Sequence, residues 1–529
     1  MTNKHIILDN YFEYINNISS IYNLSIKEFD EYNYSLVEFM THAIYDRTTP
    51  YPNALKLARK LNDIGDPYLA YKLLDKESKL SKNKFQRQYL KVRSASFLLS
   101  TGIYKKAEII LIGISNELGD SDLDTGLSCY ISGILAFINL VFYENFMKAE
   151  KYLNRINKIY KYAPEKNPQG FDSICRSDIY TLYYHTLCDI YIKIAKNSKY
   201  AIKRAYLAKL ENLMNYKKLD VEYFKLMYEL NYCELQILRG DLNGALITIK
   251  SLENKIKNTH YERWMNSSIF SVYASIYSEM NDTKRTYKYF KRSIMASKIY
   301  GNTIDEYIMI NDSFNIVFKD FKNKNVSEII KYEEPLIDQL IQLLRLKDWY
   351  TSADHSKNVR NITINIAKYL MKKKQIHISE HDLYVLQFGA YLHDIGKLYI
   401  TWFELNKTAP LTNEEFSLIK NHTVFGKQIL QKLNMDKLGD FAIGHHERID
   451  GSGYPKGEKN HPLLVNIVAL ADTFDAGTST SRKYRKVRKE SEIINEIKKL
   501  SGKAFYPKIV NAIIKLSNAG INLKSYKGD

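Results

Sequence analysis

Residues 391–400 read YLHDIGKLYI and place a histidine and an aspartate, His393 and Asp394, side by side within an apolar stretch. On a straight helix, neighbouring side chains point about 100° apart. Both residues can therefore face one site only if that site lies between several helices. Imidazole and carboxylate groups together suit iron, manganese or zinc. This stretch predicts a metal site inside a helical bundle.

The distribution of histidines supports a metal site in this part of the chain. Eight of the 12 histidines fall within residues 355–461, where an even distribution over 529 residues would place two or three. Several stand beside residue types that a hydrolytic metal site needs, and one further carboxylate follows. The candidate ligands are His355, His393, Asp394, His422, His445, His446 and Asp472.

Asp394 is the candidate for a bridging ligand, because one carboxylate has two oxygens and can contact two cations. Two cations can activate water and neutralise charge on a phosphodiester, which predicts phosphodiester hydrolysis. A second histidine–aspartate pair, His381 and Asp382, should face elsewhere. We expect His377 and His461 to be surface or capping residues.

Further motifs follow the first in a fixed order: LNKTAPLTNEEF, NHTVFGKQIL, HHERIDGSGYPKG and IVALADTFDA. Together they span roughly residues 336–515 and resemble the HD-GYP family of cyclic dinucleotide phosphodiesterases, within the HD superfamily of metal-dependent phosphohydrolases. The resemblance implies an enzyme that opens cyclic di-GMP to linear pGpG, and it leaves a further step to GMP open. Two alternatives remain: an adaptor that senses the nucleotide without hydrolysing it, and a phosphodiesterase for another cyclic dinucleotide such as cyclic GMP-AMP.

The resemblance also implies roles for individual residues. The family's metal ligands fall on the seven candidates above, with Asp394 as a catalytic residue. Lys397, the other catalytic candidate, would contact a substrate phosphate. The loop DGSGYP would bind substrate through Asp450, Gly451, Gly453, Tyr454 and Pro455, and the basic run after Asp472 through Arg482 and Arg485.

The chain departs from the family pattern in two places. Lys483 replaces the usual proline in the basic run, which also lies one residue farther from Asp472 than is usual, so the reach of Arg482 is in question. Thr351 replaces a glutamate that serves a third metal in some members. We therefore expect two divalent metal ions, iron or manganese, and release of the linear dinucleotide.

The first three hundred residues predict a different architecture. Apolar residues recur at helical spacing, and a turn followed by a small residue reappears at intervals of 37 to 52 residues. The small residues are Ala70, Ala107, Ala149, Ala201, Ala245 and Thr286. Such residues allow paired antiparallel helices to approach closely, and each pair then buries its other face against the next pair. The pattern resembles degenerate tetratricopeptide repeats.

We therefore predict an all-α protein, with a tetratricopeptide-like helical solenoid over residues 1–330 and an HD-type helical bundle over residues 331–529. The polar stretch Lys322–Glu334, directly before Pro335, marks the boundary. Helical repeats of this kind bind a protein partner, although a passive spacer or a dimerisation surface is the alternative. A homodimer stays open.

Composition limits the remaining possibilities. The net charge of +18 suits phosphate-bearing ligands. Tyrosine rings can stack on the bases of single-stranded nucleic acid, but the 43 tyrosines are spread along the repeats and suit packing better. No nucleic-acid polymer is therefore expected. The four cysteines form no CxxC pair, and no signal peptide opens the chain, which favours the cytoplasm. Residues 126–143 carry no charge, yet they contain Ser128, Ser132 and Asn139, so we expect a buried repeat helix and no membrane span.

Overall fold

The computed structural model of the protein describes residues 67–119, 122–159, 173–214, 222–259, 261–299, 354–406, 410–479 and 488–525, together with isolated positions at 54–62 and 306–348. Backbone contacts divide the chain into two compact units, with the change between residues 317 and 318. The boundary predicted between residues 330 and 331 lies outside the described residues. Every regular element in the described part is helical, so the all-α prediction is confirmed.

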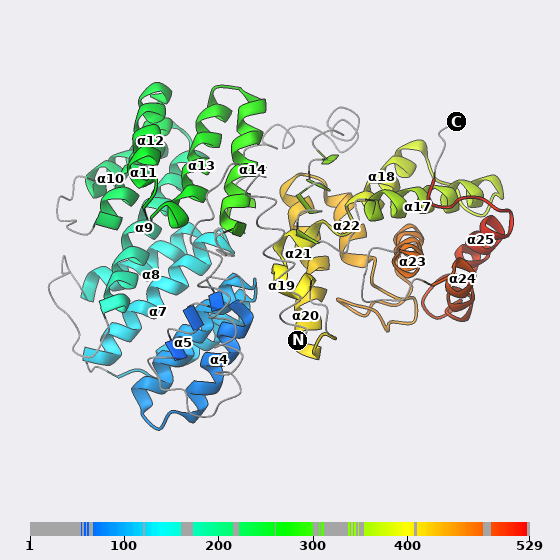
Figure 1. Cartoon of the computed structure of the whole chain (residues 1–529), viewed down its shortest axis with the longest axis horizontal. Helices are drawn as coiled ribbons and strands as arrows, with labels where there is room; N and C mark the ends of the chain where they lie inside the picture. The colour runs from blue at the N-terminus through cyan, green and yellow to red at the C-terminus, as the bar shows by residue number, and fades with distance from the viewer. Residues whose placement is uncertain are drawn as a thin grey trace. The chain divides into compact units, whose positions relative to one another are not determined.

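The first unit is a series of helices (Figure 1). They are α4 (Pro67–Leu80), α5 (Lys84–Ser100), α6 (Tyr104–Glu117), α7 (Asp122–Val141), α8 (Phe146–Ile159), α9 (Ser173–Asn197), α10 (Tyr200–Met214), α11 (Glu222–Arg239), α12 (Leu242–Ile256), α13 (Tyr261–Glu279) and α14 (Thr283–Ile299). Each helix packs against the next one in the chain. Helices from successive pairs also touch, as α7 does with α9 and α11 with α13.

The predicted small residues lie near the start of the second helix of each pair. Ala107, Ala149 and Ala245 are fully buried, which brings their helices close to the preceding ones. Ala70 and Thr286 are buried too. The prediction is wrong for Ala201, which is exposed in the first turn of α10. The buried residues of that helix, Leu210 and Met214, lie near its other end.

Helix α7 contains residues 126–141 of the uncharged stretch 126–143, and this part is a buried helix, as predicted. Ala136 and Leu140 pack with Ala149 of α8 and Ile190 of α9 in one apolar cluster. The side-chain amide nitrogen of Asn139 donates to the Leu135 carbonyl at 2.8 Å, within the same helix. Among the described helices, none is both long and apolar enough to cross a membrane.

The second unit is a bundle of shorter helices. They are α17 (His355–Lys372), α18 (Glu380–Leu392), η2 (Ile395–Tyr399), α19 (Trp402–Leu405), α20 (Asn413–Lys420), α21 (His422–Lys432), α22 (Asp436–Gly444), α23 (Leu463–Thr478), α24 (Glu490–Lys499) and α25 (Pro507–Asn518). Helix α17 packs against α18, α23 and α25, and α22 packs against α18, α21 and α23.

This packing brings several helix ends together. Helices α17 and α21 begin at His355 and His422, while α18 and α22 end directly before His393 and His445. Helix α23 lies against α17, α18 and α22. The histidines at these four helix ends therefore lie around one site, next to α23.

Candidate metal centre

The seven predicted ligands form two adjacent groups. Ligand atoms of His355, His393 and Asp394 lie within 4.8 Å of one another, and so do those of His422, His445 and His446. Asp472 joins the first group, since its Oδ1 lies 3.3 Å from His355 Nε2 and 3.9 Å from His393 Nε2. Residues from distant parts of the sequence therefore converge as the spacing predicted.

Asp394 lies between the two groups. Its Oδ2 is 3.3 Å from His393 Nε2 and 3.7 Å from His355 Nε2. Its Oδ1 is 3.5 Å from His422 Nε2 and 3.8 Å from His445 Nε2. Each oxygen of one carboxylate thus faces a different set of imidazoles, which is the arrangement that a bridging ligand requires.

Both His393 and Asp394 face the site because no straight helix runs through them. Helix α18 ends at Leu392, and the chain continues into the 3₁₀-helix η2 at Ile395. A close approach of η2 to α21 completes the junction: a Cβ on Gly396 would lie only 1.9 Å from the His422 carbonyl oxygen. Only glycine fits there, so Gly396 holds the two halves of the site together.

Hydrogen bonds fix the orientation of the imidazoles. Nδ1 of His393 lies 2.7 Å from the Ala390 carbonyl, Nδ1 of His422 lies 2.6 Å from the Ile419 carbonyl, and Nδ1 of His445 lies 2.8 Å from the Ala442 carbonyl. Because a carbonyl oxygen only accepts, each Nδ1 carries the hydrogen. In a neutral ring, Nε2 is then left with a lone pair directed into the site.

These lone pairs face one another. His422 Nε2 and His445 Nε2 are 3.2 Å apart, and the buried His393 Nε2 has no hydrogen-bond partner among the described residues. Burial lowers the pKa of His422 and lowers the pKa of His445 to about 3, so both rings are neutral near pH 7. Opposed lone pairs repel unless a cation lies between them, so these residues fit a metal ion.

The acidic residues of the site remain charged. Burial opposes ionisation of Asp394, but the nearby Lys397 ammonium and His393 hold its pKa well below the usual value. Burial also opposes ionisation of Asp472, and the hydrogen bond from His355 holds its pKa well below the usual value. The site therefore offers two carboxylates and five imidazoles, a donor set that suits divalent transition metals.

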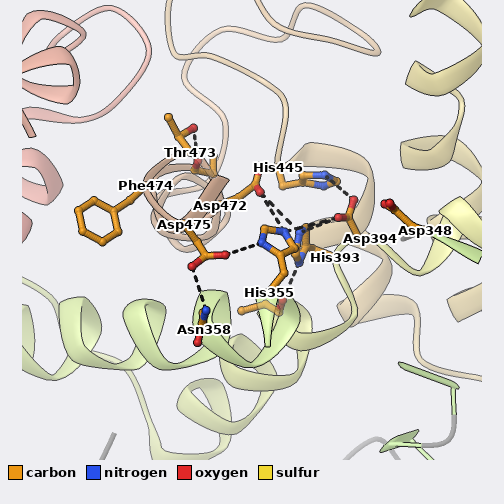
Figure 2. Close-up of polar contacts among 12 residues, drawn as sticks. Asp348, His355, Asn358, His393, Asp394, His445, Asp472, Thr473, Phe474 and Asp475 are labelled. Atoms are coloured by element: carbon orange, nitrogen blue, oxygen red, sulfur yellow. Dashed lines mark hydrogen bonds and ion pairs between the residues drawn. The ribbon is translucent and has the colours of Figure 1, made fainter. Parts of the chain in front are cut away.

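The sequence did not single out Asp475, which lies one helical turn after Asp472 on α23. Its Oδ2 accepts from His355 Nδ1 at 2.7 Å, and its Oδ1 accepts from the Asn358 amide at 3.0 Å. Figure 2 shows His355 between Asp475 on one side and Asp394 and Asp472 on the other. Spacing from Asp472 was the only available signal for Asp475, because an i,i+3 pair shares a helix face.

Lys397 lies beside the first group of ligands. Its Nζ is 2.8 Å from Asp394 Oδ2 and 3.0 Å from Asp348 Oδ2, and both carboxylates are buried. The lysine was predicted, but Asp348 was not, since nothing in its local sequence distinguishes it from other acidic residues. An ammonium group held at the edge of a metal site can contact an anionic ligand.

The DGSGYP loop approaches the second group through Tyr454, whose ring stacks on His446 with centroids 4.6 Å apart. A Cβ on Gly453 would lie 2.4 Å from the His446 carbonyl oxygen, so the loop needs glycine there. Gly451 has φ 84° and Pro455 follows a cis peptide bond. Asp450 is exposed, and its carboxylate accepts hydrogen bonds from the backbone and the hydroxyl of Ser452, within the loop.

The loop is fastened by a residue that the sequence reading did not select. Glu447 is buried, and its carboxylate accepts from the backbone amides of Lys456 at 2.7 Å and Glu458 at 3.1 Å. It stands directly after the adjacent histidines His445 and His446 in the chain. The helix end that carries these ligands therefore also fixes the loop.

The remaining sequence predictions divide into two kinds. His377 and His381 are exposed, and Asp382 forms a capping box with Ser379 at the start of α18, so this second pair faces away from the site as predicted. The prediction is wrong for His461, which is neither at the surface nor a helix cap: it is buried, and its Nε2 lies 3.2 Å from the side-chain amide nitrogen of Asn466. Thr351, Arg482 and Arg485 lie outside the described residues.

Comparison with known families agrees with this geometry. Residues 326–509 match the family model of the HD domain. The two groups of ligands, from His355 to Asp472, all fall inside the matched segment. The matched segment thus covers most of the second unit, whereas the tetratricopeptide-like character of the first unit remains a prediction.

Curated relatives match part of the chain. The chain is 36% identical over 201 residues to a cyclic di-GMP phosphodiesterase of Thermotoga maritima, covering 36% of this chain and 53% of that protein. It is 37% identical over 157 residues to 3′3′-cGAMP-specific phosphodiesterase 3 of Vibrio cholerae, covering 29% of this chain and 32% of that protein. It is 30% identical over 196 residues to the cyclic di-GMP phosphodiesterase response regulator RpfG of Xanthomonas campestris, covering 36% and 50%. The matches thus span about half or less of each relative's length.

Proposed function

We propose that the protein is a metal-dependent phosphodiesterase that hydrolyses cyclic di-GMP to linear pGpG. The observation that carries this proposal is the position of Asp394, whose two oxygens face two separate sets of imidazoles. A carboxylate so placed can bridge two cations, and a pair of cations is suited to phosphodiester hydrolysis. Relatives named as cyclic di-GMP phosphodiesterases supply the substrate class.

Two divalent ions, iron or manganese, would be held by the two groups. His355, His393, Asp472 and Asp394 Oδ2 would hold one, and the other would be held by His422, His445, His446 and Asp394 Oδ1. When bound, such ions act as Lewis acids and lower the pKa of water. The carbonyl-held Nδ1–H groups of His393, His422 and His445 would keep these imidazoles aimed at the ions before substrate arrives.

Substrate would be held by residues around this centre. Lys397 would contact a phosphate oxygen through its ammonium group, and Tyr454 would line the entrance beside His446. The Phe416 ring lies 6.2 Å from the Tyr454 ring, and Lys420 lies over both rings, which provides aromatic surface and positive charge for a nucleotide. Arg482 and Arg485 are further candidates for phosphate contacts.

The test compares two matched variants of the full chain. Asp394→Ala removes the bridging carboxylate, whereas Asp382→Ala removes an aspartate that also follows a histidine but caps α18 on the surface. With Mn(II) or Fe(II) and cyclic di-GMP, we expect Asp394→Ala to lose at least about 1,000-fold in turnover. Asp382→Ala should keep turnover and lose about 1 kcal/mol of stability.

Unchanged hydrolysis in Asp394→Ala would refute the site. The same assay run with 3′3′-cGAMP tests the substrate: preferential cleavage of that nucleotide would replace cyclic di-GMP in the proposal. Accumulation of pGpG is the expected product pattern for a centre with two metals, and rapid appearance of GMP would contradict it.

We further propose that the first unit binds a protein partner or regulates the second unit. Large apolar side chains are exposed on α6, α8 and α12, where Ile109 is 73%, Met147 71% and Ile247 73% exposed. Exposed apolar side chains on several helices of such an array support a binding role for this unit. Deletion of residues 1–320 should change the turnover or its regulation, and identical behaviour without them would remove this part of the proposal.

A further inference from the structure

A short segment near the end of the chain, residues 521–525, is fixed against the helix that begins with His355. The Asn361 side-chain amide donates to the Lys524 carbonyl at 2.8 Å. The Asn365 amide donates to the Leu523 carbonyl at 3.0 Å, and the Leu523 side chain is 3% exposed. Two side chains of α17 and one buried apolar residue therefore set the position of this segment.

The segment delivers an ammonium group to Asp475. Lys524 Nζ lies 2.8 Å from Asp475 Oδ1, which also accepts from Asn358 at 3.0 Å. The other oxygen, Oδ2, accepts from His355 Nδ1 at 2.7 Å. Since both oxygens have partners on opposite sides, the carboxylate cannot rotate without breaking a hydrogen bond.

We propose that Lys524 is a positioning residue for the metal ligand His355, acting through Asp475. This inference rests on the proposed function only in that His355 is taken to hold a cation. Carboxylates that accept from the second nitrogen of a ligating imidazole set the orientation of the ring. Here the carboxylate itself is fixed by a charged group that comes from a separate segment near the chain end.

The charge of Lys524 matters because of where Asp475 lies. The Asp475 side chain is fully buried, and its other two partners, the Asn358 amide and the His355 ring once it holds a cation, carry no positive charge of their own. A buried carboxylate needs both hydrogen bonds and an opposite charge. The Lys524 side chain remains 31% exposed, so its ammonium group satisfies the carboxylate while it keeps part of its hydration.

Calorimetric titration of the full-length, metal-free protein with Mn(II) tests this role. We expect Lys524→Met to bind the ion at the His355 group about tenfold more weakly, because loss of an outer-shell partner typically costs 10- to 100-fold in affinity. Lys524→Arg should restore most of the affinity. Lys515→Met is the matched control, since Lys515 is an exposed lysine on α25 of the same unit.

A second comparison separates positioning from a general packing effect. In an Asp475→Asn background, Lys524→Met should add little further loss, since the proposed route runs through that carboxylate. If Lys524 had only a general packing role, Lys524→Met would lower the Mn(II) affinity by the same factor with and without Asp475→Asn. If Lys524→Met lowers the helical circular dichroism signal, the comparison uses Lys524→Gln and Lys524→Arg instead. The Mn(II) affinity of these two variants should then differ about tenfold.

Two outcomes overturn the proposal: equal Mn(II) affinity in Lys524→Met and Lys515→Met, or full additivity with Asp475→Asn. Failure of the proposed function gives a different result. In that case the unmodified protein binds no Mn(II), or His355→Ala binds it as tightly as the unmodified protein does.

Discussion

The ammonium nitrogen of Lys397 lies 3.0 Å from a carboxylate oxygen of Asp348, and both side chains are almost fully buried. On its other side, the same nitrogen contacts Asp394 Oδ2 at 2.8 Å. The segment around Asp348 is itself attached to η2, because Lys347 Nζ donates to the Leu398 carbonyl at 2.6 Å. The position of Lys397 thus depends on residues that precede the HD motif by about fifty positions.

Replacement of Asp348 should weaken nucleotide binding. In Asp348→Asn the Lys397 ammonium loses one charged partner, and a charge-assisted hydrogen bond is worth about 1.5–3 kcal/mol. We expect KM for cyclic di-GMP to rise roughly tenfold, with unchanged Mn(II) content. Asp338→Asn is the control: Asp338 belongs to the same segment but accepts from the Tyr391 hydroxyl. Equal KM values in the two variants would contradict this account.

Metal binding should release a proton from His355. Burial alone would lower the pKa of this imidazole, but its hydrogen bonds to Asp472 and Asp475 raise the pKa from 6.5 to about 10 in the metal-free protein. A cation needs the Nε2 lone pair, so it displaces the proton. Apparent affinity at the His355 group should therefore rise about tenfold per pH unit above pH 7 and level off near pH 10.

Calorimetry in buffers of different ionisation enthalpy measures this release. One proton per chain is expected at pH 7.5, because His422 and His445 have lowered pKa values and are already neutral. Asp475→Asn removes a hydrogen bond that raises the pKa of His355 and should reduce the released fraction. Heats that are independent of the buffer would show that His355 is neutral before the metal binds.

The convergence of the candidate ligands was easier to predict from the sequence than their surroundings. His355, His422 and Asp472 stand in motifs whose residue types suit a metal, and the structure brings them together. The break between α18 and η2 could not be predicted, because residues 390–395 contain neither proline nor glycine. Partners such as Asp475 are defined only by tertiary packing.

Gly453→Ala tests whether the DGSGYP loop depends on close backbone contact. The added Cβ would meet the His446 carbonyl at 2.4 Å and the Arg448 amide nitrogen at 2.5 Å, so the loop must move away from the second ligand group. We expect about 2 kcal/mol of destabilisation and a loss of Tyr454 stacking, with kcat/KM reduced at least roughly tenfold. Thermal unfolding and steady-state kinetics measure the two effects.

Gly113→Ala is the control for that substitution. Gly113 lies on an exposed face of α6, and a Cβ there would meet nothing within 4 Å. Alanine is the better helix former by about 0.5–1 kcal/mol, so this variant should be slightly more stable and equally active. If Gly453→Ala and Gly113→Ala had the same stability and the same kcat/KM, the proposed close backbone contact at Gly453 would be contradicted.

The first unit offers its own matched pair in Ala245 and Ala201, which hold equivalent places in the sequence pattern but differ in burial. Ala245 of α12 is fully buried, whereas Ala201 of α10 is exposed. Helical periodicity marks both as small residues after a turn, and only packing decides which of them faces inward.

Ala245→Leu should destabilise the first unit by about 1–3 kcal/mol, because a well-packed interior resists added methylene groups. Ala201→Leu should change stability by no more than about 0.5 kcal/mol. Urea unfolding monitored by circular dichroism measures the difference, and equal destabilisation by the two leucines would place Ala201 inside the helix pair after all.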